Sequence, residues 1–179
     1  MSKKMGISAL LILLNISVVG QVLASDPQGW GKVYMLGSII ETACAIDISS
    51  RDQTIDMGLM PVSVIAREGQ SITRPFTIQL VNCTLAKNSK SQPEWQHFQV
   101  TFDGKPDAGL FSVHGEAQGI ALQIADSQGN IALPGIALPK GEVHSGDMPL
   151  KYSLRLVSNN KLLRAGEYFS TVKFKMDYY

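Results

Sequence analysis

The sequence predicts an all-β domain, a sandwich of immunoglobulin-like size and strand spacing. Beyond residue 24, apolar residues alternate with polar ones in most segments, as in strands with one buried face. Turn-forming pairs such as Asp103 with Gly104 and Pro134 with Gly135 separate these segments. No stretch there keeps a helical period over three turns, although residues 61–68 are compatible with one or two turns. The length of 179 residues fits one such domain.

Residues 1–24 have the pattern of a secretory signal peptide. Lys3 and Lys4 precede an apolar run over residues 7–19, and small residues stand just before Ser25. This order predicts export, with cleavage after Ala24. A membrane anchor is the disfavoured alternative, because the apolar run is shorter than the roughly 20 residues that span a bilayer.

The predicted mature chain of 155 residues is almost neutral. Two of the 16 basic residues and none of the 15 acidic residues lie in the signal, which leaves 14 against 15 and a net charge of −1. This balance disfavours a nucleic-acid partner, since such binding relies on a basic surface that releases counterions. The high apolar and low charged content also argues against a disordered chain.

The two cysteines, Cys44 and Cys83, predict one disulfide bond in an exported chain. It closes a loop of about 40 residues and contributes on the order of 4 kcal/mol in the chain-entropy model. Two thiols 39 positions apart lack the close spacing of a zinc site, and the redox pattern Cys-x-x-Cys is missing from the sequence. The bridge is therefore expected to be structural.

Five alternating segments give the predicted strands in chain order. The first four place these apolar residues on one face: Phe76, Ile78 and Leu80; Phe98, Val100 and Phe102; Ile120, Leu122 and Ile124; Leu150, Tyr152, Leu154 and Leu156. The last segment is the longest, because residues 168–178 alternate without a break and only Tyr179 follows. This terminal strand is expected to face the core with its even-numbered residues.

The segment 31–40 is apolar on both parities, with Val33 and Met35 on one and Tyr34 and Leu36 on the other. One interpretation places it as a central strand of the chain's own sheet. The other pairs part of it with another chain, by addition of a strand at an open sheet edge. The pattern by itself leaves both open.

Residue types that could form an active site or a metal site do not cluster in the sequence. His97, His114 and His144 are scattered, and no helical His pair with a spaced Glu accompanies them. His144, Ser145 and Asp147 have the residue types of a hydrolase triad, but such close neighbours are better explained as a loop. We expect no enzyme activity, no cofactor and no small-molecule substrate.

Several features together resemble the subunits of chaperone–usher pili, the fimbriae of Gram-negative bacteria, over the whole chain after the signal. They are the segment 31–37 (GKVYMLG), residues 55–58 (IDMG), residues 81–83 (VNC), the cysteine pair, Gly166 at the fourteenth position from the C-terminus, and the penultimate Tyr178. The resemblance implies a sandwich that lacks its final strand. It also implies that a periplasmic chaperone lends a strand during folding. By the same resemblance, the N-terminal extension of the next subunit is expected to replace that strand at the outer-membrane usher, in donor-strand exchange.

The resemblance assigns roles to particular residues. It implies a flexible lead over residues 25–31, a pilin domain over residues 32–179 and a donor strand with Gly31, Val33 and Met35 on one face. Basic residues of the chaperone are expected to bind the Tyr179 carboxylate. The edge of the acceptor groove, which also contacts the chaperone, is expected to hold Gly166, Tyr168, Val172, Phe174, Met176 and Tyr178.

Within the family, the segments 100–104, 119–126 and 162–179 resemble the minor subunit that terminates and anchors the P-pilus rod. The short lead before the first strand is instead similar to that of a major, rod-forming subunit, which stays the alternative. A sugar-binding adhesin of this family has an added receptor domain, for which 155 residues leave no room. The expected destination is the surface fimbrium, a fibre used in cell adhesion, where neighbouring subunits are the partners.

Overall fold

The computed structural model describes residues 29–88 and 92–179. The predicted signal peptide and the first part of the lead lie outside these residues. The chain forms an N-terminal unit that ends at Ile39 and a compact unit over Ile40–Tyr179. Residues 32–39, which the sequence assigned to the domain, are part of the N-terminal unit.

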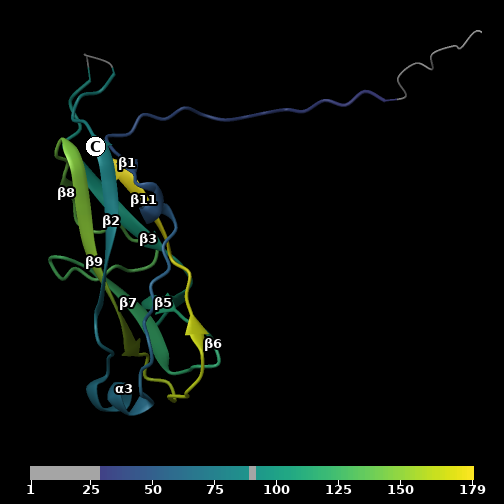
Figure 1. Cartoon of the computed structure of the whole chain (residues 1–179), viewed down its shortest axis with the longest axis vertical. Coiled ribbons are helices and arrows are strands. Elements are labelled where there is room, and N and C mark those ends of the chain that lie inside the picture. Colours follow the sequence, from purple (N-terminus) through teal and green to yellow (C-terminus); the bar gives the residue numbers. More distant parts are fainter. Residues whose placement is uncertain (1–28, 89–91) are drawn as a thin grey trace, which may run out of the picture. The chain divides into compact units, whose positions relative to one another are not determined.

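The larger sheet of the compact unit has six antiparallel strands in the order β1-β2-β9-β7-β5-β4 (Figure 1). Its centre is formed by the long strands, which the alternating apolar pattern had predicted. The bounds are β1 (Ala45–Ile46), β2 (Arg74–Cys83), β4 (Pro106–Asp107), β5 (Leu110–Ser112), β7 (Ile120–Asp126) and β9 (Gly146–Ser158).

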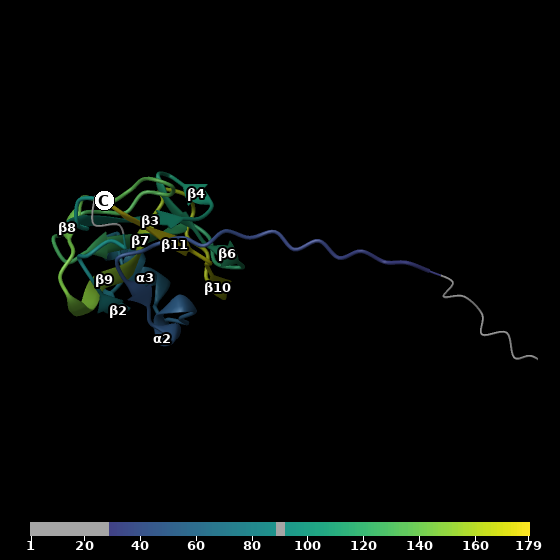
Figure 2. The same ribbon diagram turned by 90° about the horizontal axis from the view of Figure 1, so that it is seen from above.

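The second sheet has three antiparallel strands in the order β11-β3-β8, with β3 and β11 side by side (Figure 2). A separate two-stranded sheet joins β10 to β6. Their bounds are β3 (His97–Asp103), β6 (His114–Gly115), β8 (Gly141–Glu142), β10 (Tyr168–Phe169) and β11 (Lys173–Tyr178).

The core lies between the sheets and is built from inward-facing residues of both. On the larger sheet, Ile78, Leu80, Phe111 and Leu156 are at most 1% exposed. Phe102 of β3 meets the Tyr152 ring of β9 edge-on, with 5.1 Å between ring centroids. Buried and partly exposed residues alternate along β9 as predicted. The all-β sandwich is therefore confirmed.

Two short helices interrupt the strands. Helix α2 (Ile48–Arg51) begins at Asp47, whose carboxylate accepts a hydrogen bond from the Ser49 N–H. Helix α3 (Val62–Glu68) ends at Gly69, which adopts a left-handed conformation with φ of 72°. One or two turns at residues 61–68 were compatible with the sequence, whereas α2 is too short to show a helical period.

The predicted C-terminal strand over residues 168–178 is divided into β10 and β11. β10 pairs with β6, whereas β11 pairs with β3. Between them the Ser170 hydroxyl donates to the main-chain oxygen of Ser112, a hydrogen bond of 2.7 Å. The change of partner interrupts the ladder but preserves the parity, so an alternating pattern cannot reveal it.

Residues 29–42 form no strand, and each of them is exposed. The structure therefore does not include this segment as a central strand, which was one of its two interpretations. No helix within the described ranges is long and apolar enough to cross a membrane.

The predicted disulfide between Cys44 and Cys83 is present, and both cysteines are buried. It connects the chain just before β1 to the last residue of β2. The Thr84 N–H also donates to the Ala43 carbonyl, at 2.8 Å. This cross-link holds β1, which has only two residues, against the long β2.

Candidate functional site: an unpaired strand edge

The strand β11 is an edge strand with one occupied side. Its six residues pair with β3 from Lys173 opposite Asp103 to Tyr178 opposite Phe98. On its other side, no strand of the described chain pairs with it. Its outward N–H and C=O groups are therefore available to an additional strand.

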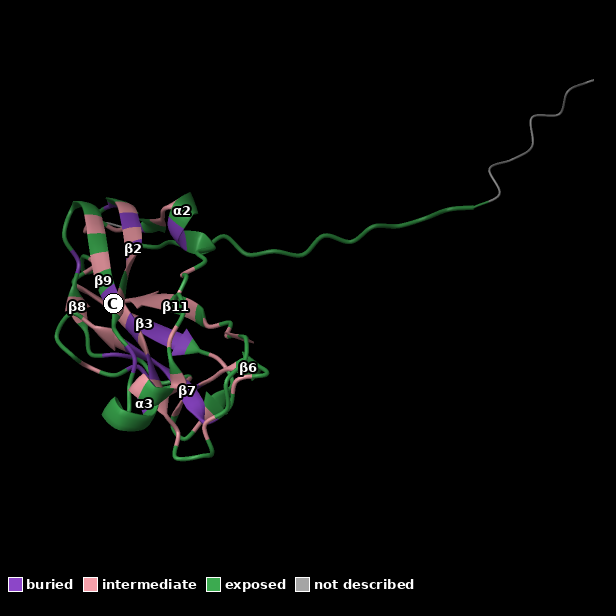
Figure 3. Ribbon diagram, turned by 60° about the horizontal axis from the view of Figure 1, so that its bottom comes forward, coloured by how far each residue is buried: buried purple, intermediate pink, exposed green. Residues whose placement is uncertain are grey.

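The side chains of this edge alternate as the sequence predicted. Lys173 and Lys175 are exposed, whereas the even-numbered residues pack against the core but remain partly exposed (Figure 3). Phe174 lies against Phe102, with 6.3 Å between ring centroids. The partly covered apolar residues on this face are Tyr168, Val172, Phe174, Met176 and Tyr178. A further strand beside β11 would shield them from water.

A segment without regular secondary structure reaches the same core from the opposite wall. Within residues 52–61, Ile55, Met57 and Met60 pack against the buried cluster and are themselves partly exposed. Since this stretch makes no strand, it contributes apolar side chains to the core but no β-ladder hydrogen bonds.

A small cavity marks the β10 end of this region. It has a volume of about 80 Å³, and its lining includes Gly166 and Tyr168 on one side and Met60 on the other. The buried core residues Ile65 and Leu156 also line it, so this hollow reaches the interior.

Gly166 is needed where two segments approach closely. A Cβ placed on it would lie 2.5 Å from the Glu116 Cβ and 2.8 Å from the Ala117 nitrogen. Two main-chain hydrogen bonds join these segments, because the N–H groups of Glu116 and Ala117 both donate to the Glu167 carbonyl. The missing side chain lets β10 reach β6.

The C-terminal residue is held by the neighbouring strand. The Tyr179 N–H donates to the His97 carbonyl at 2.9 Å, and a terminal oxygen accepts from the N–H groups of Gln96 and His97 at 2.8 and 3.2 Å. The Lys140 ammonium lies 4.5 Å from the centre of the Tyr179 ring. The chain terminus therefore has a defined place at the end of β11.

Two tyrosines of this face have raised pKa values. Burial raises the pKa of Tyr178 to about 12. Burial also raises the pKa of Tyr168, with a further contribution from the negative charge of Asp56. The Tyr178 ring additionally contacts Trp95, at 6.1 Å between ring centroids. These shifts reflect the partial burial of both aromatic side chains in the apolar face.

Comparison with known proteins identifies the family, although no protein-family model matches the chain. The PRS and PAP fimbrial minor pilin proteins of Escherichia coli are each 34% identical over 166 residues, which cover 86% of this chain and 84% of theirs. The chain belongs to the fimbrial pilins, the subunits of chaperone–usher pili. It is a structural subunit of a surface pilus assembled through the periplasm, not an enzyme.

Two further similarities are more distant. The major MR/P fimbria protein of Proteus mirabilis is 29% identical over 176 residues, 95% of this chain and 96% of the relative. The solved structure of the P pilus rod subunit PapA has a TM-score of 0.66 and 20% identity, and covers 77% of this pilin and all of PapA. The structural similarity confirms a pilin fold.

The residues predicted for assembly fall into separate parts of this pilin. Those predicted for the groove edge lie on β10, on β11 and in the residues that join or precede them. Gly31, Val33 and Met35 lie in the N-terminal unit, where Val33 and Met35 are each 91% exposed. The packing of Ile55 and Met57 against the core was not predicted. The alternation of apolar and polar residues over 55–58 could have indicated it.

Replacing Gly166 by alanine is expected to lower the free energy of unfolding by about 1–3 kcal/mol, because the new methyl group overpacks the contact with Glu116. Urea unfolding of the chaperone complex, followed by tryptophan fluorescence, measures the effect. Gly29→Ala is the matched control, since no atom lies within 4 Å of its added Cβ. Equal stability of the two variants would contradict the proposed close approach.

Proposed function

We propose that this pilin is a minor subunit that terminates or anchors its fibre, and that it is assembled by donor-strand exchange. The observation that carries the assembly mechanism is the free edge of β11 above a row of partly covered apolar side chains. An inserted strand supplies partners for the unpaired N–H and C=O groups and covers that row in one step.

The proposed acceptor edge consists of Gly166, Tyr168, Val172, Phe174, Met176 and Tyr178. A donor strand whose alternate residues are apolar matches it, since a strand repeats its faces every two residues. The cavity lined by Met60 and Tyr168, about 80 Å³ in volume, sets the room for a donor side chain at the β10 end. The donor is therefore selected by side-chain size as well as by main-chain pairing.

A periplasmic chaperone is the proposed first donor, and the outer-membrane usher is the proposed site of exchange. Without a lent strand, the apolar row and the β11 edge favour aggregation. The Tyr179 carboxylate is the proposed contact for basic residues of the chaperone. Its main-chain hydrogen bonds to Gln96 and His97 support this role, because they hold the negative charge in place.

The proposed donor strand of this pilin has Gly31, Val33 and Met35 on the face that enters the groove of a neighbouring subunit. The exposure of Val33 and Met35 supports this role. Apolar side chains in contact with water cost free energy, and burial in a neighbour's groove removes that cost. Gly31 suits a position of close backbone approach, because it has no side chain.

The role as a minor subunit is supported by similarity. The two minor pilins are 34% identical to this chain, against 29% for the major MR/P fimbria protein. A major rod-forming subunit is the alternative, and the fibres of a deletion strain distinguish the two.

Co-expression in the periplasm with a pilus chaperone is expected to give a soluble one-to-one complex. The chain expressed without it is expected to aggregate or to be degraded, because its acceptor edge stays open. Size-exclusion chromatography of periplasmic extracts measures both. A stable, folded monomer in the absence of any chaperone would refute the open edge.

Aspartate at Val33 or Met35 is expected to block incorporation into the fibre. An unpaired carboxylate would be buried in an apolar groove, at a cost of several kcal/mol. The chaperone complex is expected to survive, since the donor strand does not take part in it. Tyr34→Asp is the control, because its side chain lies on the opposite face. Normal incorporation of the Val33 and Met35 variants, scored by immunoblot of sheared pili, would refute the donor assignment.

Deletion of the gene is expected to give longer fibres that are shed into the medium, because growth is not terminated and the base is not anchored. Electron microscopy and the ratio of shed to cell-bound pili measure the effect. Complete loss of rods would instead identify the chain as the major subunit.

A further inference from the structure

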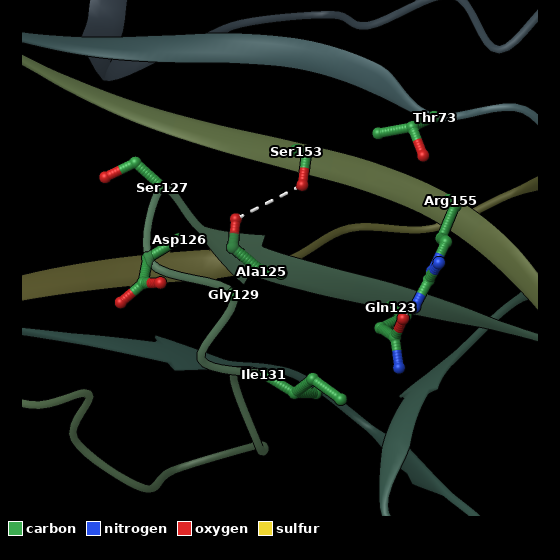
Figure 4. A pocket seen from close by; sticks show the side chains of 9 residues that line it. All are labelled: Thr73, Gln123, Ala125, Asp126, Ser127, Gly129, Ile131, Ser153 and Arg155. Carbon is green, nitrogen blue, oxygen red and sulfur yellow. Dashed lines mark hydrogen bonds between the residues drawn. The ribbon is translucent and has the colours of Figure 1, made fainter.

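A polar hollow lies on the outer face of the six-stranded sheet, on the side away from the core. Its floor is formed by Gln123 and Ala125 of β7 with Ser153 and Arg155 of β9, which pair across the two strands (Figure 4). Residues 126–131 form one rim, and Thr73 stands at another. The volume is about 320 Å³, enough for one amino-acid side chain or sugar unit.

Arg155 is the cationic group of this hollow, and it is held in place. Its Nε–H donates to the side-chain oxygen of Gln123, which is only 8% exposed. This bond orients the guanidinium plane. Among the described carboxylates, none lies within ion-pair distance of Arg155. The terminal guanidinium nitrogens therefore provide a positioned pair of donors without an acidic partner.

The nearby Asp126 makes no ion pair with Arg155, and its carboxylate organises the rim. It accepts hydrogen bonds from the main-chain N–H groups of Gln128 and Asn130 at 2.9 and 2.8 Å, and from the Asn130 side-chain amide at 2.8 Å. Its negative charge in the same hollow disfavours doubly charged anions such as phosphate. Asp126 repels a singly charged carboxylate less than it repels such an anion.

We propose that this hollow binds a carboxylate, specifically an acidic side chain of a neighbouring pilus subunit. Arg155 pairs with the carboxylate, the Thr73 hydroxyl offers a further donor, and Ile131 packs against the methylene groups. A neighbouring subunit is the source because this pilin acts in a fibre of such subunits. The proposal rests on that family membership and is independent of donor-strand exchange.

The hollow and the β11 edge can be occupied together. β7 and β9 belong to the six-stranded sheet, whereas β11 belongs to the three-stranded one. The core-facing residues Ile124 and Leu154 alternate with the hollow's residues, which places the hollow on the outer face. The contact is thus a lateral one, additional to any strand inserted beside β11.

The first test measures carboxylate binding by the mature chain in its soluble chaperone complex. The probe is the α-amide of N-acetylglutamic acid, and its neutral control is N-acetylglutamine amide. Saturable NMR shifts of the Arg155 Nε–H and the Gln123 side-chain amide are expected with the acid alone. Arg155→Gln is expected to weaken binding about tenfold or more, since a charge-assisted pair is lost.

Lys151→Gln is the matched control for that variant. It removes one positive charge from the outward face of the same strand β9 but lies outside the hollow. Binding within about twofold of the unmodified chain is expected. Equal shifts with the neutral probe, or equal weakening by both substitutions, would overturn the proposal.

The second test identifies the source of the carboxylate in assembled pili. A photo-cross-linking amino acid at the exposed rim residue Ser127 is expected to capture an adjacent pilus subunit, at a yield that falls with Arg155→Gln and stays unchanged with Lys151→Gln. Glucuronate serves as the free-acid arm in the binding assay. Tight binding of glucuronate without any subunit cross-link would overturn the proposed source, as would a cross-link insensitive to Arg155.

Discussion

The rest of this pilin's structure depends on one constraint, the unpaired edge of β11. Backbone N–H and C=O groups of a strand require partners, and the apolar side chains beneath the edge require cover. The chain supplies β3 on one side only. Phe174 and Met176 consequently pack against the core while part of their surface remains in water. A fold with this feature is complete only when a strand of another chain pairs with β11.

The surrounding structure keeps this edge in shape while leaving it open. The Cys44–Cys83 disulfide anchors the short β1 to β2 on the opposite sheet. The close approach of Gly166 to Glu116 lets the neighbouring β10 pair with β6. At the other end, hydrogen bonds from Gln96 and His97 hold Tyr179. The edge is thus a preformed surface, which lowers the entropic cost of adding a strand.

The two faces of the six-stranded sheet have different chemistry because side chains alternate along each strand. Ile124 and Leu154 contribute to the apolar core, whereas Gln123 and Arg155 of the same strands line a polar hollow. A strand can therefore stabilise the domain and present a contact surface at once. For a fibre subunit, this arrangement separates the covering of the core from contacts with a lateral neighbour.

The amino-acid pattern by itself determined the all-β class, the parity of each long strand and the single disulfide. These features depend on local alternation and on a count of two cysteines, so they can be read without a partner strand in view. Only the tertiary structure decided that residues 168–178 are divided between β6 and β3, and that Ile55 and Met57 pack against the core without forming a strand. It alone also placed Gln123 beside Arg155. Pairing partners and cross-strand neighbours are set by contacts between distant segments. Alternation along one segment therefore does not identify them.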